Sequence, residues 1–227
     1  GYDLSHLTVG ALGGHSGLDV AHGAKQHGFR TVIVAQKGRE RTYGYYRSRE
    51  GRGCVDELIQ VSKFQDILEE YVQEKLRDMN TIFIHNRYFW VYFDDFTKVE
   101  HDFEVPIFGS RTLLKLEERD QVYNQYHLLE DAGIRTPKLF KKADQIDRLC
   151  IVKAAEAERS YERAFFLVKN RSEWEERGSS LEAEGKAGPG WREATIEEFV
   201  IGSPVNFNFF YSPLTGELEL MGTDTRR

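Results

Sequence analysis

The residues best suited to chemistry form a glycine-rich turn with a histidine, Gly13-Gly14-His15-Ser16, between a predicted strand at 7–11 and a predicted helix at 16–27. Where a strand runs into a helix, several backbone N–H groups lack a partner, and the positive end of the helix dipole lies behind them. Such a turn can bind an anion, most often a phosphate, and His15 adds a hydrogen-bond donor beside it. The full dinucleotide-binding fingerprint is not met, so a tight turn without a ligand stays the alternative.

A basic loop, Gln36-Lys37-Gly38-Arg39 followed by Tyr43, comes after the next predicted strand at 31–35. The carboxyl ends of parallel strands meet at one edge of a sheet, so we expect this loop to lie near the first turn. Lys37 could then hold a phosphate as a point charge, and Arg39 through two parallel hydrogen bonds. A basic loop by itself is usually solvated surface, but two anion-binding features at one edge favour a binding role.

Two further segments, both in the second half of the chain, could hold a nucleotide. Lys153 stands at the end of an apolar strand predicted over 149–153, from which its amine could reach phosphate groups. The segment 196–202 could present carboxylate and backbone groups to an adenine and a ribose. Each signal is weak by itself, because charged strand ends and amphipathic edge strands are common without any ligand.

The composition predicts a globular protein, because 40% of the 227 residues are hydrophobic and they include 15 Phe and 11 Tyr. A net charge of −6 argues against a general nucleic-acid or membrane-surface binder, since both partners repel a negative protein. Cys54 and Cys150 are too few for a disulfide framework, and both are expected to be inert buried thiols. With no signal-peptide pattern and no membrane-length apolar run, a cytoplasmic setting fits best. No catalytic triad, zinc-ligand spacing or Walker lysine motif occurs in the sequence.

The first half of the chain alternates strands and helices, which predicts a parallel sheet with helices on both faces. Strands are expected at 7–11, 31–35, 58–61, 81–84 and 105–108. Ser62 and Gln65 form a capping-box pattern for a helix that ends at Asn80. The aromatic run 88–93 is expected to pack in a core or a subunit contact rather than to stack on a base.

The second half predicts a long helix over about 113–132, which Gly133 ends, and then an antiparallel sheet. Its strands are expected at 149–153, 165–169 and 195–200, followed by a hairpin over 205–221. Between these strands, Ser172 and Glu175 begin a helix, and the polar stretch 178–190 is expected to be a mobile loop. The change of sheet type predicts two domains, 1–110 and 111–227.

Several blocks of the sequence are similar to one known family. They are 12–25, 28–32, 36–39, 105–111, 132–138, 197–202 and 209–213. Together they resemble the archaeal formate-dependent formaminoimidazole-carboxamide ribonucleotide synthetases of purine biosynthesis, over nearly the whole chain. The resemblance implies an α/β fold with a Rossmann-like, parallel-sheet domain that binds the ribonucleotide and precedes the ATP-grasp domain. It also implies that an α+β ATP-grasp domain follows and is incomplete at its C-terminus.

The same resemblance implies a ligase of IMP biosynthesis that joins formate to the amine of an aminoimidazole-carboxamide ribonucleotide, with ATP and through formyl phosphate. Mg²⁺, or alternatively Mn²⁺, would bridge the phosphates. The partners would be small molecules rather than nucleic acid or membrane, and the protein would be a homo-oligomer, a trimer or a hexamer. The implied substrate-binding residues are Gly13, Gly14, His15, Ser16, Lys37, Arg39 and Tyr88. The implied ATP-binding residues are Lys153, Glu197, Glu198, Val200 and Asn206.

The chain departs from this family at three places. After Lys153 the family has a glycine-rich loop over the phosphates, whereas residues 154–163 contain three acidic side chains and no glycine. Asn86-Arg87-Tyr88 stands where the family has His-Gly-Ser, and the carboxylates expected to hold the metal belong to a part of the family beyond residue 227. These departures leave two alternatives. One is a catalytically impaired paralogue that binds a purine-pathway ribonucleotide as a regulatory or scaffolding subunit, and the other is an ATP-grasp ligase for a different amine.

Overall fold

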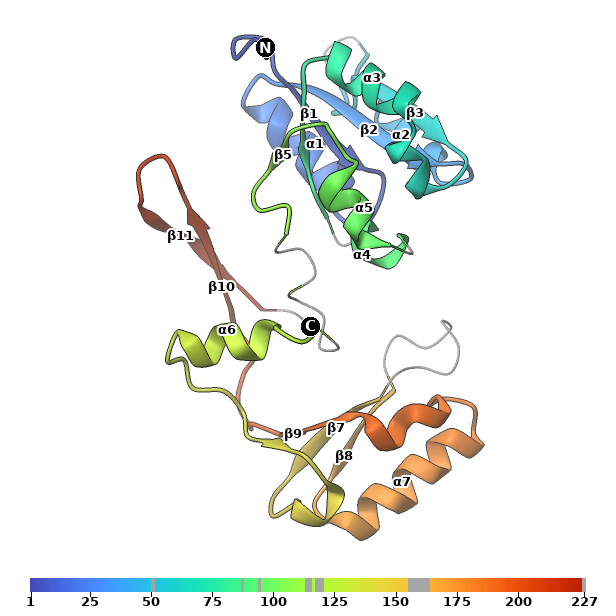
Figure 1. Cartoon of the computed structure of the whole chain (residues 1–227), viewed down its shortest axis with the longest axis vertical. Coiled ribbons are helices and arrows are strands. Elements are labelled where there is room, and N and C mark those ends of the chain that lie inside the picture. The colour runs from blue at the N-terminus through green and yellow to red at the C-terminus, as the bar shows by residue number, and fades with distance from the viewer. Residues whose placement is uncertain are drawn as a thin grey trace. The chain divides into compact units, whose positions relative to one another are not determined.

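The computed structural model contains two compact units, Gly1–Ala132 and Gly133–Arg227 (Figure 1). The structure describes residues 1–49, 52–86, 88–93, 95–112, 116, 121–154 and 164–225, without the side chains of residues 90 and 91. In this described part, none of the helices combines the length and the apolar character needed to cross a bilayer. The domain division near residue 110 rests on the change of sheet type and stays a prediction.

The first unit is built on a five-stranded sheet in the order β3-β2-β1-β4-β5, in which all neighbouring strands are parallel. The strands are β1 (Thr8–Leu12), β2 (Arg30–Gln36), β3 (Glu57–Val61), β4 (Thr81–Ile84) and β5 (Ile107–Phe108). The prediction of a parallel sheet is confirmed. The strand order reverses between β1 and β4, and the carboxyl ends of strands at such a reversal are where ligands bind in open α/β sheets.

Helices cover both faces of this sheet. They are α1 (Gly17–Gln26), α2 (Glu40–Tyr45), α3 (Glu70–Asp78), α4 (Tyr88–Val91), α5 (Phe96–His101) and the 3-10 helix η1 (Phe64–Leu68). One face packs against η1 and α3 in a core that includes Leu12 and Leu76. The opposite face packs against α1 and α2 in a core that includes Ala11, Ala21 and Tyr43. Ala11 and Leu12 reach different cores because side chains alternate along a strand.

The helix predicted after Ser62 is divided into two parts, η1 and α3. Extended backbone angles at Glu69, with φ −67° and ψ 135°, separate them. The capping box predicted for Ser62 and Gln65 is wrong. The carboxylate of Asp66 accepts hydrogen bonds from the backbone N–H groups of Ser62 and Lys63, at 3.0 Å each, so the cap lies one residue later.

The aromatic run 88–93 includes α4, and its residues Phe89 and Phe93 pack in the core, as expected. Phe89 is fully buried, and its ring lies edge-to-face against that of Phe83 at 5.6 Å between centroids. Phe93 is also buried and stacks on Phe89 at 5.3 Å. Tyr88 and Tyr92 are only half-buried, which leaves their hydroxyl groups within reach of polar partners.

The sequence predicts a long helix over 113–132, and the predicted start of this helix is wrong. Residues 121–124 are not helical, and α6 spans only Gln125–Asp131. The side chain of Asn124 accepts a hydrogen bond from the N–H of Tyr126 at 3.0 Å, which caps the helix at that point. Residues 113–115 and 117–120 lie outside the described residues. Gly133 follows α6 with a φ of +65°, the left-handed conformation expected of a residue that ends a helix.

The second unit contains a four-stranded sheet in the order β6-β9-β7-β8, and its neighbouring strands are antiparallel, as predicted. The strands are β6 (Leu139–Phe140), β7 (Cys150–Ala154), β8 (Ala164–Val168) and β9 (Thr195–Glu198). The helices are α7 (Arg171–Ala183) and the 3-10 helices η3 (Ala143–Gln145) and η4 (Pro189–Glu193). Val152, Trp174 and Trp191 are buried in the core that these elements form.

Helix α7 begins earlier and ends later than the sequence predicts. The side chain of Asn170 accepts a hydrogen bond from the N–H of Glu173 at 2.9 Å, so the cap predicted at Ser172 is wrong. The mobile loop predicted over 178–190 is also wrong, because α7 continues to Ala183 and η4 follows. The physical reason is the buried indole of Trp191, which packs so closely on Gly178 that an added Cβ would lie 2.2 Å from Cζ3.

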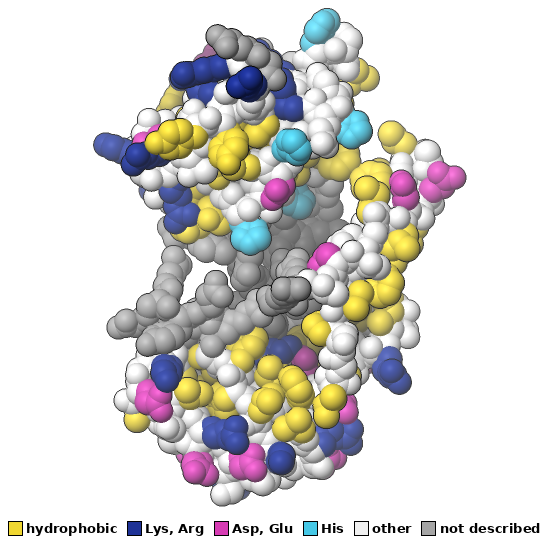
Figure 2. Space-filling model, turned by 180° about the vertical axis from the view of Figure 1, so that it is seen from behind, with side chains coloured by type: hydrophobic (Ala, Val, Ile, Leu, Met, Phe, Trp, Pro, Cys, Tyr) yellow, Lys and Arg dark blue, Asp and Glu magenta, His cyan; other side chains and the backbone are white. Residues whose placement is uncertain are grey.

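The predicted hairpin is confirmed as β10 (Asn206–Tyr211) and β11 (Leu218–Asp224), which pair as a separate two-stranded sheet. Phe207, Phe209 and Tyr211 alternate along β10 and are 61%, 57% and 59% exposed. Figure 2 shows hydrophobic side chains gathered along this hairpin. The amides of Asn206 and Asn208 donate to the two carboxylate oxygens of Asp224, at 3.0 and 2.8 Å.

Each unit contains one of the two cysteines, and both thiols are buried, as the sequence predicts. Cys54 is 7% exposed in the first unit, and Cys150 is 0% exposed in the second. Burial raises the pKa of both thiols, which keeps them protonated and unreactive in the folded protein.

Candidate functional site

The glycine-rich turn lies at the carboxyl end of β1, where the strand order reverses. The N–H of Gly13 donates to the carbonyl of Val34 at 2.7 Å, and the N–H of Gly14 donates to that of Leu12 at 2.8 Å. These two amides are therefore used by the turn itself, so fewer N–H groups are free than the sequence suggests. Within the described part of the chain, the N–H groups of His15 and Ser16 donate to no other backbone group. These two amides are therefore available to an anion.

Polar side chains at the same turn are also available to a ligand. Ser16 stands at the N-terminus of α1, and its hydroxyl makes no capping hydrogen bond. The imidazole of His15 is exposed, and its Nδ1 lies 3.4 Å from the Ser16 Oγ. His15 and Ser16 therefore offer a ring nitrogen, a hydroxyl and two backbone amides at the same turn.

Both glycines of the turn are required by tyrosine rings packed against it. A Cβ on Gly13 would lie 2.8 Å from Cε2 of Tyr43, and a Cβ on Gly14 would lie 2.2 Å from the ring of Tyr88. The Tyr43 hydroxyl donates to the carbonyl of Gly14 at 3.2 Å, and burial raises the pKa of this phenol. Only a residue without a side chain allows the rings to approach the backbone this closely.

Arg39, in the loop expected at this edge, contacts Tyr88, which only the family resemblance named as a site residue. Arg39 Nη1 donates to the Tyr88 hydroxyl at 2.9 Å, and Arg39 Nη2 donates to the hydroxyl of Tyr92 at 2.8 Å. Unlike the side chain of Arg39, the exposed side chain of Lys37 makes no hydrogen bond or ion pair with any described residue. The structure thus brings together Gly13, Gly14, His15, Ser16, Arg39 and Tyr88, whereas a ligand contact of Lys37 stays a prediction.

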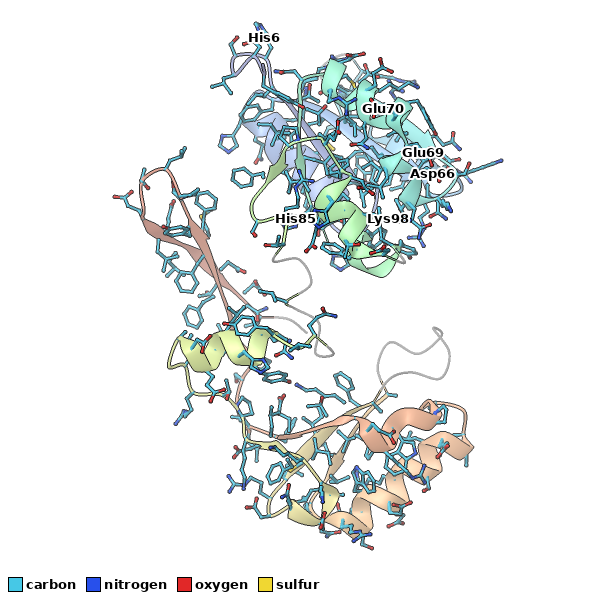
Figure 3. The ribbon with its side chains drawn as sticks, viewed as in Figure 1. His6, Asp66, Glu69, Glu70, His85 and Lys98 are labelled. Atoms are coloured by element: carbon cyan, nitrogen blue, oxygen red, sulfur yellow. The ribbon has the colours of Figure 1, made fainter. Side chains whose placement is uncertain are left out.

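Two polar residues directly after β4 received no site role from the sequence, His85 (labelled in Figure 3) and Asn86. The Asn86 amide donates to the carbonyl of Leu12 at 3.1 Å and accepts from the N–H of Tyr88 at 3.0 Å, so it joins the end of β1 to α4. His85 is half-buried beside Gly109, where an added Cβ would lie 3.3 Å from its Nε2. The rule that placed the first two loops at this edge applies equally to the loop after β4 and could have found both residues.

Burial lowers the pKa of His85, and this gives the protein a predictable dependence on pH. The unfolded chain binds the proton more readily than the folded one, so stability is complete above the ordinary histidine pKa of about 6.5. Stability then falls as the pH decreases toward the folded-state pKa. We expect His85→Gln to reduce the decrease in melting temperature between about pH 7 and about pH 5. Thermal unfolding at a series of pH values measures this, with the exposed His22→Gln as the control. Equal slopes for the wild type and His85→Gln would contradict the prediction.

In the second unit, Lys153 on β7 forms an ion pair with Glu197 on the neighbouring strand β9. The Lys153 Nζ lies 2.8 and 2.7 Å from the two carboxylate oxygens of Glu197. The side chains are only 15% and 11% exposed. A lysine ammonium has three N–H donors, so this pair leaves one for an additional acceptor such as a phosphate oxygen.

The other predicted ATP-binding residues do not join this pair. Glu198 follows Glu197 on β9 and points to the other face, where it accepts from the Lys138 N–H at 3.2 Å and from Arg148 at 3.1 Å. These two hydrogen bonds lower the pKa of Glu198, the one from Lys138 most strongly. Val200 lies beyond β9 and is 63% exposed, and Asn206 lies on β10. Nucleotide contacts of Glu198, Val200 and Asn206 stay predictions.

In the part of the chain that the structure describes, no group of three or more His, Cys, Asp or Glu side chains is placed to hold a metal ion. Ala154 ends β7, and the remainder of the acidic loop predicted to replace the family's phosphate loop, 155–163, lies outside the described residues.

Two family models match the chain. One, described as "Protein of unknown function (DUF1246)", matches residues 9–140, and the other, "Domain of unknown function (DUF1297)", matches residues 173–227. Among curated proteins, the 5-formaminoimidazole-4-carboxamide-1-(beta)-D-ribofuranosyl 5'-monophosphate synthetase of Methanothermobacter thermautotrophicus is 38% identical over 100% of the chain. The synthetase of the same name from Methanobrevibacter smithii is 38% identical over 99% of the chain. The chain spans 60% and 59% of the lengths of these two relatives.

Solved structures show the same fold. The IMP biosynthesis protein PurP from Thermococcus kodakaraensis matches with a TM-score of 0.66 and 23% identity, over 96% of this chain and 59% of that one. The N5-carboxyaminoimidazole ribonucleotide synthetase from Thermotoga maritima matches with a TM-score of 0.57 and 17% identity, over 96% of this chain and 52% of that one. This likeness confirms the predicted α/β fold class. Because the first family model matches more than half of the chain, the chain belongs to the family described as "Protein of unknown function (DUF1246)", and its resemblance to the archaeal ribonucleotide synthetases is confirmed.

Proposed function

We propose that the protein carrying this chain is an ATP- and formate-dependent ligase that formylates 5-aminoimidazole-4-carboxamide ribonucleotide in IMP biosynthesis. Formate would attack the terminal phosphate of ATP, which forms formyl phosphate and releases ADP. The amine of the ribonucleotide would then attack the formyl carbon, so that a C–N bond forms and phosphate leaves. The chief structural support is the cluster of His15, Ser16, Arg39 and Tyr88 at the carboxyl edge of the first sheet.

The first unit would bind the ribonucleotide. Its turn offers the amides of His15 and Ser16, and Arg39 adds a positive charge at the same edge. Phosphate esters bind well to backbone amides and arginine together, because both direct N–H donors at several oxygens. The names of the curated relatives support a phosphorylated imidazole riboside as the ligand.

The second unit would bind ATP beside Lys153. The ion pair with Glu197 fixes the position of the lysine amine on a strand of the sheet, and its remaining N–H could donate to a phosphate oxygen. Divalent magnesium, a cytoplasmic setting and a homo-oligomer are further parts of this proposal that follow from the family resemblance. The names of the curated relatives support an active ligase and not a catalytically impaired paralogue.

Release of ADP tests the activity directly. The full-length protein is incubated with ATP, Mg²⁺, formate and the aminoimidazole-carboxamide ribonucleotide, and ADP is followed by a coupled assay. We expect ADP release that requires both formate and the ribonucleotide, with one formylated product per ADP. If the protein binds the ribonucleotide in calorimetry but releases no ADP, the ligase proposal is wrong. ADP release that requires another amine would assign a different substrate.

His15→Ala is expected to weaken ribonucleotide binding by about 1.5–3 kcal/mol, the usual loss for one hydrogen bond to a charged group. Isothermal titration calorimetry with the ribonucleotide measures the dissociation constant. His22→Ala is the matched control, because His22 is an exposed histidine of α1 that lies outside the turn. A dissociation constant for His15→Ala equal to that of the control would place the pocket elsewhere.

A further inference from the structure

Arg39 is held between aromatic rings at the carboxyl edge of the first sheet. Its two terminal nitrogens donate to the hydroxyls of Tyr88 and Tyr92, at 2.9 and 2.8 Å. Its guanidinium carbon lies 5.5 Å and 5.1 Å from the centroids of these two rings, and 5.8 Å from that of Phe64. We call these four residues the arginine cage.

The three rings of the arginine cage are anchored to the core and to one another. Phe64 is 1% exposed, and its centroid lies 5.2 Å from those of Tyr88 and Tyr92. The two tyrosine rings meet edge-to-face at 4.8 Å. The arginine side chain, which is otherwise flexible, is thus fixed before any ligand arrives, and less entropy is lost on binding.

The charge of the cage is not balanced by a carboxylate in the described part of the chain. The hydrogen-bond partners of the Arg39 side chain there are two phenol hydroxyls, and no described Asp or Glu lies within ion-pair distance of it. Each phenol oxygen accepts from Arg39, which leaves the hydrogen of its own O–H group to be donated to another partner. A fixed positive charge flanked by two O–H donors suits an anion with several oxygens, such as a phosphate monoester.

The cage touches the glycine-rich turn. The ring of Tyr88 lies against Gly14, where an added Cβ would be 2.2 Å from it. The donors of the cage therefore adjoin the turn that carries His15.

We propose that the hydroxyls of Tyr88 and Tyr92, together with the Arg39 they hold, bind the phosphate of the ribonucleotide and make the site selective for phosphorylated over unphosphorylated ribosides. The identity of the ribonucleotide rests on the proposed function, whereas the preference for a phosphate monoester rests on the cage itself. Tyr92 is then both a donor to the phosphate and the residue that positions one arm of the guanidinium.

Tyr92→Phe tests the proposal, because it removes one hydroxyl and keeps the ring. We expect the dissociation constants of ribose 5-phosphate and of the aminoimidazole-carboxamide ribonucleotide to rise about tenfold or more. Binding of the unphosphorylated riboside and the melting temperature of the free protein should stay at wild-type values. Arg39→Lys, which keeps the charge but loses the planar fork, should also weaken binding of both phosphorylated probes.

Tyr45→Phe is the matched control. Tyr45 forms a similar pair with Arg41, whose Nη2 donates to its hydroxyl at 3.2 Å, but it is 74% exposed and outside the cage. We expect this variant to bind both phosphorylated probes as the wild type does. If Tyr92→Phe also binds them as tightly, or loses riboside affinity to the same extent, the phosphate role of the cage is wrong.

Two measurements, ribose 5-phosphate binding and formate-dependent ADP release, separate the role of the cage from the ligase activity. Binding of ribose 5-phosphate that depends on Tyr92, without any formate-dependent ADP release, would support the cage and overturn the ligase. If the wild type turns over the ribonucleotide and Tyr92→Phe has the same KM for it, the ligase proposal is supported and the cage proposal is overturned. If the wild type binds neither phosphorylated probe, the cage proposal is overturned.

Discussion

Lys153→Met is expected to destabilise the second unit by about 3–5 kcal/mol, because it removes the counter-charge from a carboxylate buried beside it. Lys153 and Glu197 are 15% and 11% exposed, and their charged atoms approach to 2.7 Å. Urea unfolding followed by tryptophan fluorescence measures the loss, since Trp174 and Trp191 both lie in the core of this unit. The variant should also lose binding of a non-hydrolysable ATP analogue.

Lys138→Met is the matched control for this loss. Lys138 pairs with Asp147 at an exposed position, with both side chains about half exposed (48% and 49%), so its removal should cost about 0–1 kcal/mol. Replacing both Lys153 and Glu197 by Met should restore much of the lost stability, because a buried pair exchanged for apolar side chains leaves no charge in the core. ATP-analogue binding should stay lost in this double variant. A Lys153→Met protein as stable as the Lys138→Met control would show that the buried pair contributes no more than a surface pair.

Gly178→Ala is expected to lower the free energy of unfolding by about 1–3 kcal/mol, although alanine normally stabilises the interior of a helix. The new Cβ would lie 2.2–2.4 Å from three ring carbons of Trp191. That indole cannot move aside easily, because it is 1% exposed, its Nε1 donates to the Glu182 carboxylate at 2.8 Å, and it packs against Trp174 at 4.6 Å. The melting temperature and urea unfolding both report the change.

Gly23→Ala is the control for the Gly178 variant, and we expect it to raise the free energy of unfolding instead of lowering it. Gly23 lies inside α1, and nothing comes within 4 Å of an added Cβ there, so alanine should stabilise by about 0.5–1 kcal/mol. In the Gly178→Ala background, Trp191→Phe should cost less than it costs alone, because the smaller ring makes room for the methyl group. A stabilising Gly178→Ala would mean that the indole has space to shift.

Much of the fold could be predicted from the sequence because its signals are local. Apolar runs such as 31–35 alternate with helical patterns in the first half, and this order alone favours a parallel sheet. In the second half, the alternation of Phe207, Phe209 and Tyr211 with polar residues predicted a hairpin strand. Such patterns are reliable because the spacing of apolar residues along the chain determines which face of a strand or helix they share.

The helix ends that were missed depend on contacts that the sequence does not show. The stretch that begins at Gly178 has the composition of a loop, but Gly178 lies inside a helix. The indole of Trp191, 13 residues later, packs against this position and leaves no room for a side chain there. Asn170 caps α7 in place of the predicted Ser172, and Asp66 takes the place of the predicted Gln65 in the capping box of η1. Local propensity could not choose between neighbouring candidates, and tertiary packing decided.

The candidate site was predictable only in part, for a related reason. Gly14 and Arg39 were expected at one edge because both follow parallel strands, and the structure places them there. Tyr92 was missed because the aromatic run 88–93 gives no sign of which hydroxyl faces a cation. His85 follows β4 as Arg39 follows β2, but a single histidine beside an apolar strand gave no chemical motif by itself.

The buried cysteines offer a means of observing the two units separately. Alkylating reagents attack the thiolate, and a protected thiol reacts only when the surrounding structure opens. Since Cys54 belongs to the first unit and Cys150 to the second, each acquires a mass label at a rate set by the local fluctuations of its own unit. Peptide mass spectrometry on a single sample, with and without ribonucleotide or ATP analogue, can thus tell which unit each ligand protects.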